Sequence, residues 1–262
     1  MIFYITTHQK NKLNALKVKQ MFEGTSYEFY FVYGRNQTNK VEPYIEVDCE
    51  ECYENLPIKT YFIIEHFIKT GKEFLVKMDD DTYIDFSIFK DFQCKEDYIG
   101  MFLKYPTTIK SSIFHWYTIQ NPNYKIYKKT FDLNYAEGGW YILSKKAALI
   151  CYEKGQGFYE STPETYLGED TKIGMALDRP DITKRDLLFN KGLMYETTED
   201  LMVIHPVHPV LFDKLKTCTT IEKKRDWLLR LNYLNLNFQR EIYLNKTINQ
   251  LTNENSNISS TC

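Results

Sequence analysis

Residues 74–85, FLVKMDDDTYID, decide how this chain is interpreted. The run from Phe74 to Met78 is short and mostly apolar, which is typical of a buried strand. Three adjacent aspartates, Asp79, Asp80 and Asp81, follow it at once. Their carboxylates repel one another by roughly a few kcal/mol at an effective dielectric of about 20, so a fold keeps them either solvated or around a cation.

A strand that ends in carboxylates predicts a ligand site, because open α/β sheets bind ligands just beyond the carboxyl ends of their strands. Carboxylate oxygens bind hard divalent cations, and such an ion in turn binds phosphate. We therefore interpret Asp79–Asp81 as a metal site with phosphate on its far side. An acidic turn that closes a hairpin is the competing interpretation, and residues elsewhere in the chain must decide between the two.

Composition excludes several function classes. The 262 residues suffice for one large or two small domains, and 43% hydrophobic and 26% charged residues are ordinary for a globular protein. The net charge of −2 provides no basic surface, so we expect no nucleic-acid partner. No apolar run approaches the ~20 residues of a membrane span, and the start MIFYITTHQK lacks the features of a signal peptide. We expect no membrane span in this chain.

The six cysteines are scattered without the spacing of a disulfide framework. Cys49 and Cys52 form one C-x-x-C pair, and the sequence holds no second pair with metal-ligand spacing. We therefore expect free thiols in a reducing compartment.

Alternating strand and helix patterns predict an α/β fold with a mixed, mostly parallel sheet flanked by helices. Ile2–Thr6 and Tyr27–Tyr33 are strand-like runs on either side of a helical pattern at Lys10–Phe22. This strand–helix–strand order is the beginning of a doubly wound, Rossmann-like sheet. A second helix is predicted at Ile58–Thr70, where Pro57 suits the first turn, and it leads directly into the aspartate strand.

The second half of the chain is less regular, and residues 105–130 are aromatic without a clear period. The predicted elements are strands at Tyr98–Leu103 and Tyr135–Ser144, a helix at Lys145–Glu153, a loop entering a helix at Gly168–Leu177, and a late strand or loop at Met202–His208. We expect a single domain over residues 1–215, a helical extension over 216–248 packed on it, and a disordered polar tail over 249–262.

Four acidic or histidine features could converge on one site: Asp79–Asp81, the Glu169–Asp170 pair, His205 and His208. One or two carboxylates with one imidazole would hold a divalent ion against a diphosphate leaving group, and the imidazole favours Mn²⁺ over Mg²⁺. A carboxylate at a helix start could take a proton from an attacking hydroxyl. These pieces indicate the transfer of a group from an activated nucleotide.

Two glycines, Gly138 and Gly139, would let a substrate approach the backbone closely. Each of these features also has an ordinary structural explanation. The helix dipole favours acidic residues in a first turn, two histidines can simply be hydrogen-bonded, and paired glycines often mark a turn. The order and spacing of the features must therefore decide.

Four blocks follow one another in the order CEECYENLPIKTYFIIEHFIK, EFLVKMDDDTYID, YAEGGWYILSKKA and LGEDTKIGMAL. In this order they resemble the β1,3-galactosyltransferase and Fringe-type glycosyltransferases of family 31. The family motifs are D-x-Y-x-N-L-x-x-K-T, K-x-D-D-D, Y-x-x-G-G-x-Y-x-L-S and E-D-V-x-x-G. Glu51 stands in place of the first Asp, and Thr171 stands in place of Val. The resemblance covers about residues 2–210.

The resemblance implies a GT-A fold, a UDP-sugar donor, a Mn²⁺ ion and inversion at the anomeric carbon. It makes Asp170 the base on the acceptor hydroxyl and Asp81 the direct metal ligand. Asp79 and Asp80 would lie near the ribose and around the metal, with Asp79 as a further metal candidate. A late histidine would complete the metal shell, and His205 is preferred although His208 fits as well. The residues assigned to the donor are Thr6, Lys77, Asp79, Asp80, Gly138 and Gly139.

Two departures from the family bear on location. The family usually carries a cysteine before the two glycines, where this chain has Ala136 and Glu137. Animal members are anchored in the Golgi by an N-terminal helix, whereas the first strand is predicted here from residue 2. We expect an unanchored enzyme of microbial or large-virus type in the cytoplasm (the host cytoplasm if viral), and a Golgi location only if an anchor has been removed.

We therefore expect an inverting, metal-dependent glycosyltransferase that moves a sugar from a UDP-sugar to a hydroxyl of a glycan or glycoprotein acceptor, forming a β linkage. His115, Trp116 and Tyr117 are candidates for an acceptor wall. One alternative is a non-catalytic carbohydrate- or metal-binding module, which a fold alone does not separate from an enzyme. Another is a metal-dependent phosphodiesterase, which would need two ions ~3.5–4 Å apart.

Overall fold

The computed structural model describes residues 1–103, 133–160, 167–187, 195–197, 202–204 and 217. The chain divides into two compact units, Met1–Phe212 and Asp213–Cys262. In the second unit only Thr217 belongs to the described residues, so the predicted helical extension and polar tail lie outside them.

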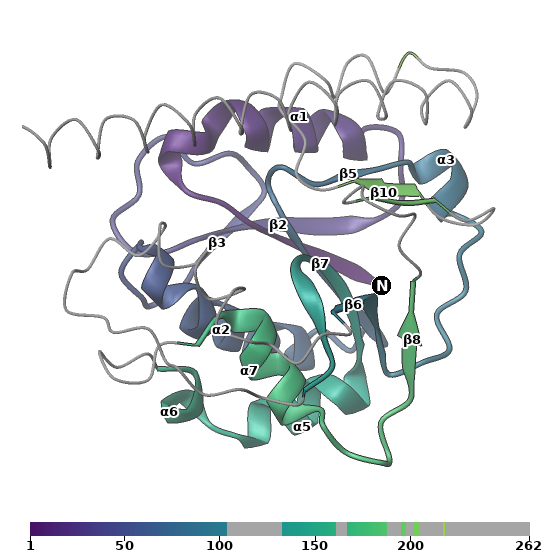
Figure 1. Ribbon diagram of the computed structural model, residues 1–262. Helices are drawn as coiled ribbons and strands as arrows, with labels where there is room; N and C mark the ends of the chain where they lie inside the picture. The colour runs from purple at the N-terminus through teal and green to yellow at the C-terminus, as the bar shows by residue number, and fades with distance from the viewer. Residues whose placement is uncertain (104–132, 161–166, 188–194, 198–201, 205–216, 218–262) are drawn as a thin grey trace, which may run out of the picture. The chain divides into compact units, whose positions relative to one another are not determined.

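A mixed sheet of seven strands organises the unit Met1–Phe212 (Figure 1). Its order is β3-β2-β1-β4-β7-β6-β8, and β7 runs antiparallel to both of its neighbours while the other pairings are parallel. The strands are β1 (Ile2–Thr6), β2 (Glu28–Tyr33), β3 (Tyr44–Glu46), β4 (Phe74–Asp79), β6 (Tyr98–Leu103), β7 (Tyr135–Ser144) and β8 (Lys184–Asp186). The predicted α/β class with a mixed, mostly parallel sheet is confirmed.

Helices cover both faces of this sheet (Figure 1). Helix α1 (Lys12–Phe22) and the short α3 (Phe86–Phe89) lie on one face, and α2 (Leu56–Lys69), α5 (Lys145–Glu153) and α7 (Glu169–Ala176) lie on the other. Each strand of the central pair is therefore buried on both faces, as the apolar runs of β1 and β4 require. The short helix α6 (Gln156–Tyr159) follows α5.

Aromatic side chains fill the face under α1 and α3. The ring of Phe3 on β1 meets those of Phe22, Tyr27, Phe86 and Phe89 edge-on, with centroids 5.1–5.7 Å apart. Such pairs add about 0.5–1.5 kcal/mol each beyond the burial of their area. The opposite face packs aliphatic and tyrosine side chains between the sheet and helices α2, α5 and α7.

Element boundaries differ from the predictions in a few places. The first helix begins at Lys12 because Gln9–Asn11 forms a 3₁₀ turn, η1, in which the amide of Lys10 donates to the His8 ring. A second 3₁₀ turn, η2 (Tyr53–Asn55), precedes α2, which starts two residues earlier than predicted. Helix α5 begins after Ser144, whose hydroxyl accepts from the amide of Ala147 at 3.1 Å.

A second, three-stranded antiparallel sheet follows the aspartates in the chain. It consists of β5 (Tyr83–Ile84), β9 (Tyr195–Thr197) and β10 (Met202–Ile204), in the order β5-β10-β9. Of the predicted segment Met202–His208, the first three residues form β10 and the rest lies outside the described residues. In the part of the chain that the structure describes, no helix has both the length and the apolar composition to span a membrane.

Candidate active site

The site begins where β1 and β4 end side by side. Thr6 pairs with Asp79 in the parallel register of these strands, and the Thr6 hydroxyl donates to Asp79 Oδ1 at 2.5 Å. The same carboxylate oxygen accepts from Lys77 Nζ at 2.7 Å. The first aspartate of the run is therefore oriented by two protein donors from the neighbouring strand and from its own.

The second aspartate points into the loop that follows β1. Asp80 Oδ2 accepts from the Thr7 hydroxyl at 2.5 Å, and Oδ1 accepts from the side-chain amides of Asn11 and Asn14, each at 3.3 Å. Asp80 is 5% exposed, and burial, with smaller repulsion from its two acidic neighbours, raises its pKa to about 7. Burial is the main cause of this rise, because it disfavours the charged carboxylate.

A pocket of about 610 Å³ opens in front of these aspartates. Its walls come from the loop after β1, from Gln37, from the segment before and into α2, and from the whole aspartate run. The lining residues are Thr6, Thr7, His8, Gln9, Lys10, Asn11, Gln37, Glu51, Cys52, Tyr53, Leu56, Lys59, Asp79, Asp80 and Asp81. The pocket lies beyond the carboxyl ends of parallel strands, which is the usual ligand position in such sheets.

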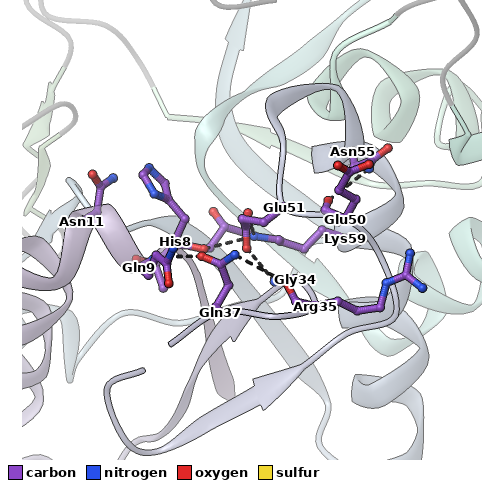
Figure 2. Close-up of polar contacts among 12 residues, drawn as sticks. His8, Gln9, Asn11, Gly34, Arg35, Gln37, Glu50, Glu51, Asn55 and Lys59 are labelled. Atoms are coloured by element: carbon purple, nitrogen blue, oxygen red, sulfur yellow. Dashed lines mark hydrogen bonds and ion pairs between the residues drawn. The ribbon is translucent and has the colours of Figure 1, made fainter. Parts of the chain in front are cut away.

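A buried ion pair between Glu51 and Lys59 forms another part of the pocket wall (Figure 2). Glu51 Oε1 accepts from Lys59 Nζ at 2.5 Å, and its Oε2 accepts from the amide of Gly34 at 2.6 Å. Lys59 also donates to the carbonyl of Thr7 at 3.1 Å, so three segments of the pocket wall are joined. A Cβ at Gly34 would lie 2.8 Å from the carbonyl oxygen of Cys49, which explains the glycine there.

A second polar contact closes the rim of the pocket (Figure 2). The Gln37 side chain accepts from the amide of Gln9 at 3.1 Å. Gln9 Oε1 in turn accepts from the amide of Thr38 at 2.8 Å and from its hydroxyl at 2.9 Å. The loops after β1 and β2 are thus held together at the mouth of the pocket.

Lys77 links the aspartate strand to the strand beside it. Its side chain is fully buried, and Nζ donates to the carbonyl oxygen of Gly138 on β7 at 2.5 Å in addition to Asp79. Nζ also forms an ion pair with Glu169 Oε1 at 3.0 Å. Burial alone would lower the Lys77 pKa, but Asp79 and Glu169 reverse this and raise it above the usual value, so the ammonium stays charged.

Glu169 and Asp170 open helix α7 on the other side of Lys77. Glu169 Oε2 accepts from the Thr60 hydroxyl at 3.0 Å and the Tyr141 hydroxyl at 2.9 Å. Burial raises the Glu169 pKa, and Lys77 opposes that rise. Asp170 is 6% exposed, and its Oδ1 accepts from the amide of Thr171 at 2.7 Å. A Cβ at Gly138 would lie 3.6 Å from Asp170 Oδ2, so this carboxylate lies against the start of β7.

The structure brings most of the predicted site residues together. Thr6, Lys77 and the three aspartates share one edge of the sheet. The Gly138 carbonyl accepts from Lys77, and the same glycine lies against Glu169 and Asp170. The Gly139 carbonyl accepts from the Thr82 hydroxyl at 2.8 Å, directly after the aspartates. The predicted histidines and acceptor wall lie outside the described residues: His205, His208, His115, Trp116 and Tyr117.

Sequence reasoning gave no site role to Thr7, Asn11 or Asn14, which hold Asp80, nor to the Glu51–Lys59 pair. The sequence does place Thr7, Asn11 and Asn14 shortly after the first predicted strand, and polar residues at that position could have indicated a role in the site. Within the described ranges, histidine, cysteine, aspartate and glutamate side chains do not form a group of three or more that could hold a metal. Cys49, Cys52, Cys94 and Cys151 are free thiols.

The chain is similar to one protein family and, more distantly, to several solved structures. The sequence profile of a family described as galactosyltransferase matches residues 26–187. A solved glycosyltransferase involved in the glycosylation of the major capsid of PBCV-1 is similar over 71% of this chain and 80% of its own, with 14% identity and a TM-score of 0.44. The galactosyltransferase LgtC, solved with donor and acceptor sugar analogs, is similar over 70% of this chain and 73% of its own, with 10% identity and a TM-score of 0.43. No curated protein sequence matches the chain.

Proposed function

We propose, from the premise that this chain belongs to the galactosyltransferase family and is a glycosyltransferase, that its donor is a UDP-sugar. The sugar would be transferred with inversion to a hydroxyl group of a glycan or glycoprotein acceptor. The single observation that carries the proposal is that Lys77 joins Asp79, in the aspartate run, to Glu169, the residue directly before Asp170. An acidic turn without function does not explain why a buried cation connects the aspartate run to the first residue of α7.

Asp170 is the proposed base of the reaction. Its carboxylate would accept the proton of the acceptor hydroxyl while the hydroxyl oxygen forms a bond to the anomeric carbon. The bond from that carbon to the diphosphate oxygen breaks, and UDP departs with the electron pair. Attack on the face opposite the leaving group inverts the anomeric centre, so an α-linked donor would yield a β linkage.

The aspartate run supplies carboxylate oxygens of the kind that divalent cations bind, and a set of three or more ligands would need a residue from outside the described ranges. Lys77 contacts Asp79 and also Glu169, so one ammonium group is shared between two carboxylates. Asp81 and Asp79, with His205 or His208, would hold Mn²⁺, for which Mg²⁺ is the alternative. When bound, the ion supplies positive charge to the departing diphosphate.

The proposal assigns the donor to the pocket between the aspartates and the Glu51–Lys59 wall. Thr6, Asp79 and Asp80 would contact the nucleotide side of the donor. The acceptor hydroxyl would approach the Asp170 carboxylate. We also propose a cytoplasmic location, for which the free thiols of Cys49, Cys52, Cys94 and Cys151 are the supporting observation.

A UDP-release assay with Mn²⁺ and a panel of UDP-sugars tests the proposal. We expect slow hydrolysis of one donor by the wild-type protein, faster release when the correct acceptor is present, and loss of both on addition of EDTA or in Asp81→Ala. No release from any donor, together with no thermal shift on addition of UDP and Mn²⁺, would contradict the proposal. Binding of UDP without turnover in the presence of acceptors would instead favour a binding module.

A further inference from the structure

A buried ion pair joins the strand that carries the aspartates to the helix that carries Asp170. Lys77 Nζ lies 3.0 Å from Glu169 Oε1, and the two side chains are 0% and 3% exposed. The same ammonium donates to Asp79 Oδ1 at 2.7 Å and to the Gly138 carbonyl at 2.5 Å. One side chain thus contacts the aspartate run, strand β7 and the first residue of α7.

Glu169 is fixed on its other oxygen as well. Its Oε2 accepts from Thr60 on α2 at 3.0 Å and from Tyr141 on β7 at 2.9 Å. Because Glu169 is the first residue of α7 and Asp170 the second, a carboxylate held by three side chains determines where this helix begins. The backbone of Asp170 cannot move without moving Glu169.

The contact between α7 and β7 leaves little room for adjustment. A Cβ at Gly138 would lie 2.8 Å from Glu169 Oε1 and 3.5 Å from Asp170 Cβ. One helical turn further along, a Cβ at Gly174 would lie 2.4 Å from Tyr135 Cβ. Helix α7 therefore lies directly on β7 at two glycines, and its position depends on the polar contacts at its first residue.

Stability alone does not account for this arrangement. A buried ion pair is often no more stabilising than apolar side chains of the same volume, because both charges must leave water. A buried pair that connects two parts of a site is better explained by the geometry it imposes. A displacement of about 1 Å between reacting groups can reduce a rate about 10²-fold, so such geometry has catalytic value.

We propose that Lys77 and Glu169 are positioning residues that set the separation between the Asp79–Asp81 edge and the Asp170 carboxylate. The inference rests on the proposed function, because it takes Asp170 as the base and the aspartate edge as the donor site. Glu169 acts through Asp170, whereas Lys77 acts through both Asp79 and Glu169. Loss of Glu169 should therefore affect catalysis alone, whereas loss of Lys77 should affect both donor binding and catalysis.

This difference gives the first test, made on the full chain with the donor identified by UDP release. We expect Glu169→Gln to lower the kcat of transfer about 10²-fold while the Kd of UDP in MnCl₂, measured by calorimetry, stays unchanged. We expect Lys77→Met to weaken UDP binding and lower kcat together. Each rate is divided by the concentration of UDP-binding sites found in the same titration. A variant that is only partly folded is then not mistaken for one with a lower kcat.

The second test leaves the ion pair intact and loosens only its support. Thr60→Val removes one hydroxyl from Glu169 Oε2 at nearly constant volume, and Thr60→Ser restores a hydroxyl. Tyr141→Phe removes the other donor. Tyr98→Phe is the matched control, since Tyr98 is equally buried but its hydroxyl accepts from the amide of Ala136. We expect a lower kcat at unchanged UDP affinity in Thr60→Val and Tyr141→Phe, and wild-type kcat in Thr60→Ser and Tyr98→Phe.

The outcomes separate this inference from the proposed function. Wild-type kcat per binding site in both Glu169→Gln and Thr60→Val, with only a lower Tm, would make the pair merely structural and overturn the inference alone. Equal losses of UDP affinity in Glu169→Gln and Lys77→Met would also overturn it. A wild-type protein with no turnover from any donor would overturn the proposed function and this inference with it.

Discussion

Gly138 and Glu169 approach each other so closely that a Cβ on the glycine would lie 2.8 Å from the Oε1 atom of the glutamate. The glutamate cannot swing aside, because Lys77, Thr60 and Tyr141 hold it. Gly138 also presents its carbonyl oxygen to Lys77. The glycine is therefore required by the close packing of the site and not by a turn, since no positive φ is recorded for it.

Gly138→Ala should reduce activity more than its single added methyl group suggests. The methyl group must displace Glu169 and the first turn of α7, which moves Asp170 away from the aspartate edge. We expect a fall in kcat of about 10²-fold and a loss of stability of about 1–3 kcal/mol from overpacking. Donor turnover and urea denaturation measure the two effects.

Gly157→Ala is the matched control, because an added Cβ at Gly157 meets nothing within 4 Å. We expect wild-type turnover and stability in this variant. Wild-type turnover in Gly138→Ala as well would show that the contact between β7 and α7 is softer than the distances indicate.

Asp170→Asn should separate chemistry from binding. The Asn side-chain oxygen can still accept from the amide of Thr171, so the start of α7 is retained. The amide has no basicity for the acceptor proton, and we expect kcat to fall about 10²–10⁴-fold at unchanged UDP affinity. Turnover near the wild-type rate would exclude Asp170 as the base.

Lys59→Met should destabilise the protein strongly. It leaves the Glu51 carboxylate without its ammonium partner in a wall where the two side chains are 4% and 14% exposed. Breaking such a pair costs about 3–5 kcal/mol, whereas Glu51→Gln together with Lys59→Met should recover part of that loss. Urea denaturation of the single and double variants measures the difference.

The exposed Glu65–Lys69 pair on α2 provides the comparison, since its side chains are 31% and 67% exposed. Lys69→Met should cost only about 0.3–0.5 kcal/mol, as is usual for helix-surface pairs. Equal costs at the two sites would mean that the pocket wall is not the rigid structure described here.

Lys172 should make stability depend on alkaline pH. It is 3% exposed, Nζ donates to the Glu160 carbonyl at 2.8 Å, and burial lowers its pKa to about 8. Between pH 8 and the unfolded value of 10.5, the unfolded chain binds more protons at this residue. Stability from this group therefore rises with pH across that window and is lowest below it.

Lys172→Met should accordingly stabilise the protein at pH 7, by about 2 kcal/mol once the lost hydrogen bond is subtracted. The gain should shrink as the pH approaches 10.5. Thermal unfolding of wild type and variant at pH 7 and pH 10 measures it, with the exposed Lys154→Met as control. A variant that is less stable than wild type at pH 7 would contradict the lowered pKa.

The aspartate edge could be predicted from sequence because its determinants are local. An apolar run of five residues followed by carboxylates indicates a strand end, and the parallel pairing of β1 with β4 then places Thr6 beside Asp79. The elements around it were located to within two or three residues. The short strands β5, β8 and β9 were missed because two or three residues have no measurable period.

The interior of the site could not be predicted in the same way. Lys77 and Glu169 stand in separate sequence blocks. The sequence around each residue does not show that β7 lies beside β4, or that it runs antiparallel to β4. Their pairing follows from which strands are neighbours, and that order is a property of the whole assembled sheet. Glu51 and Lys59 likewise match positions of one family motif in the sequence, but the sequence does not show that they pair in the wall of the pocket.

The reversed direction of β7 also has a kinetic consequence. Its first residues, with Gly138, reach the carboxyl end of β4 only because the strand runs against its neighbours, and its partner α7 comes later still in the chain. A nascent polypeptide that has completed only β1 to β4 already contains the aspartates but has neither Gly138 nor Asp170. Contacts between segments so distant in sequence form slowly. Donor turnover therefore requires that β7 has been inserted beside β4. The time at which turnover appears during refolding would measure when that insertion occurs.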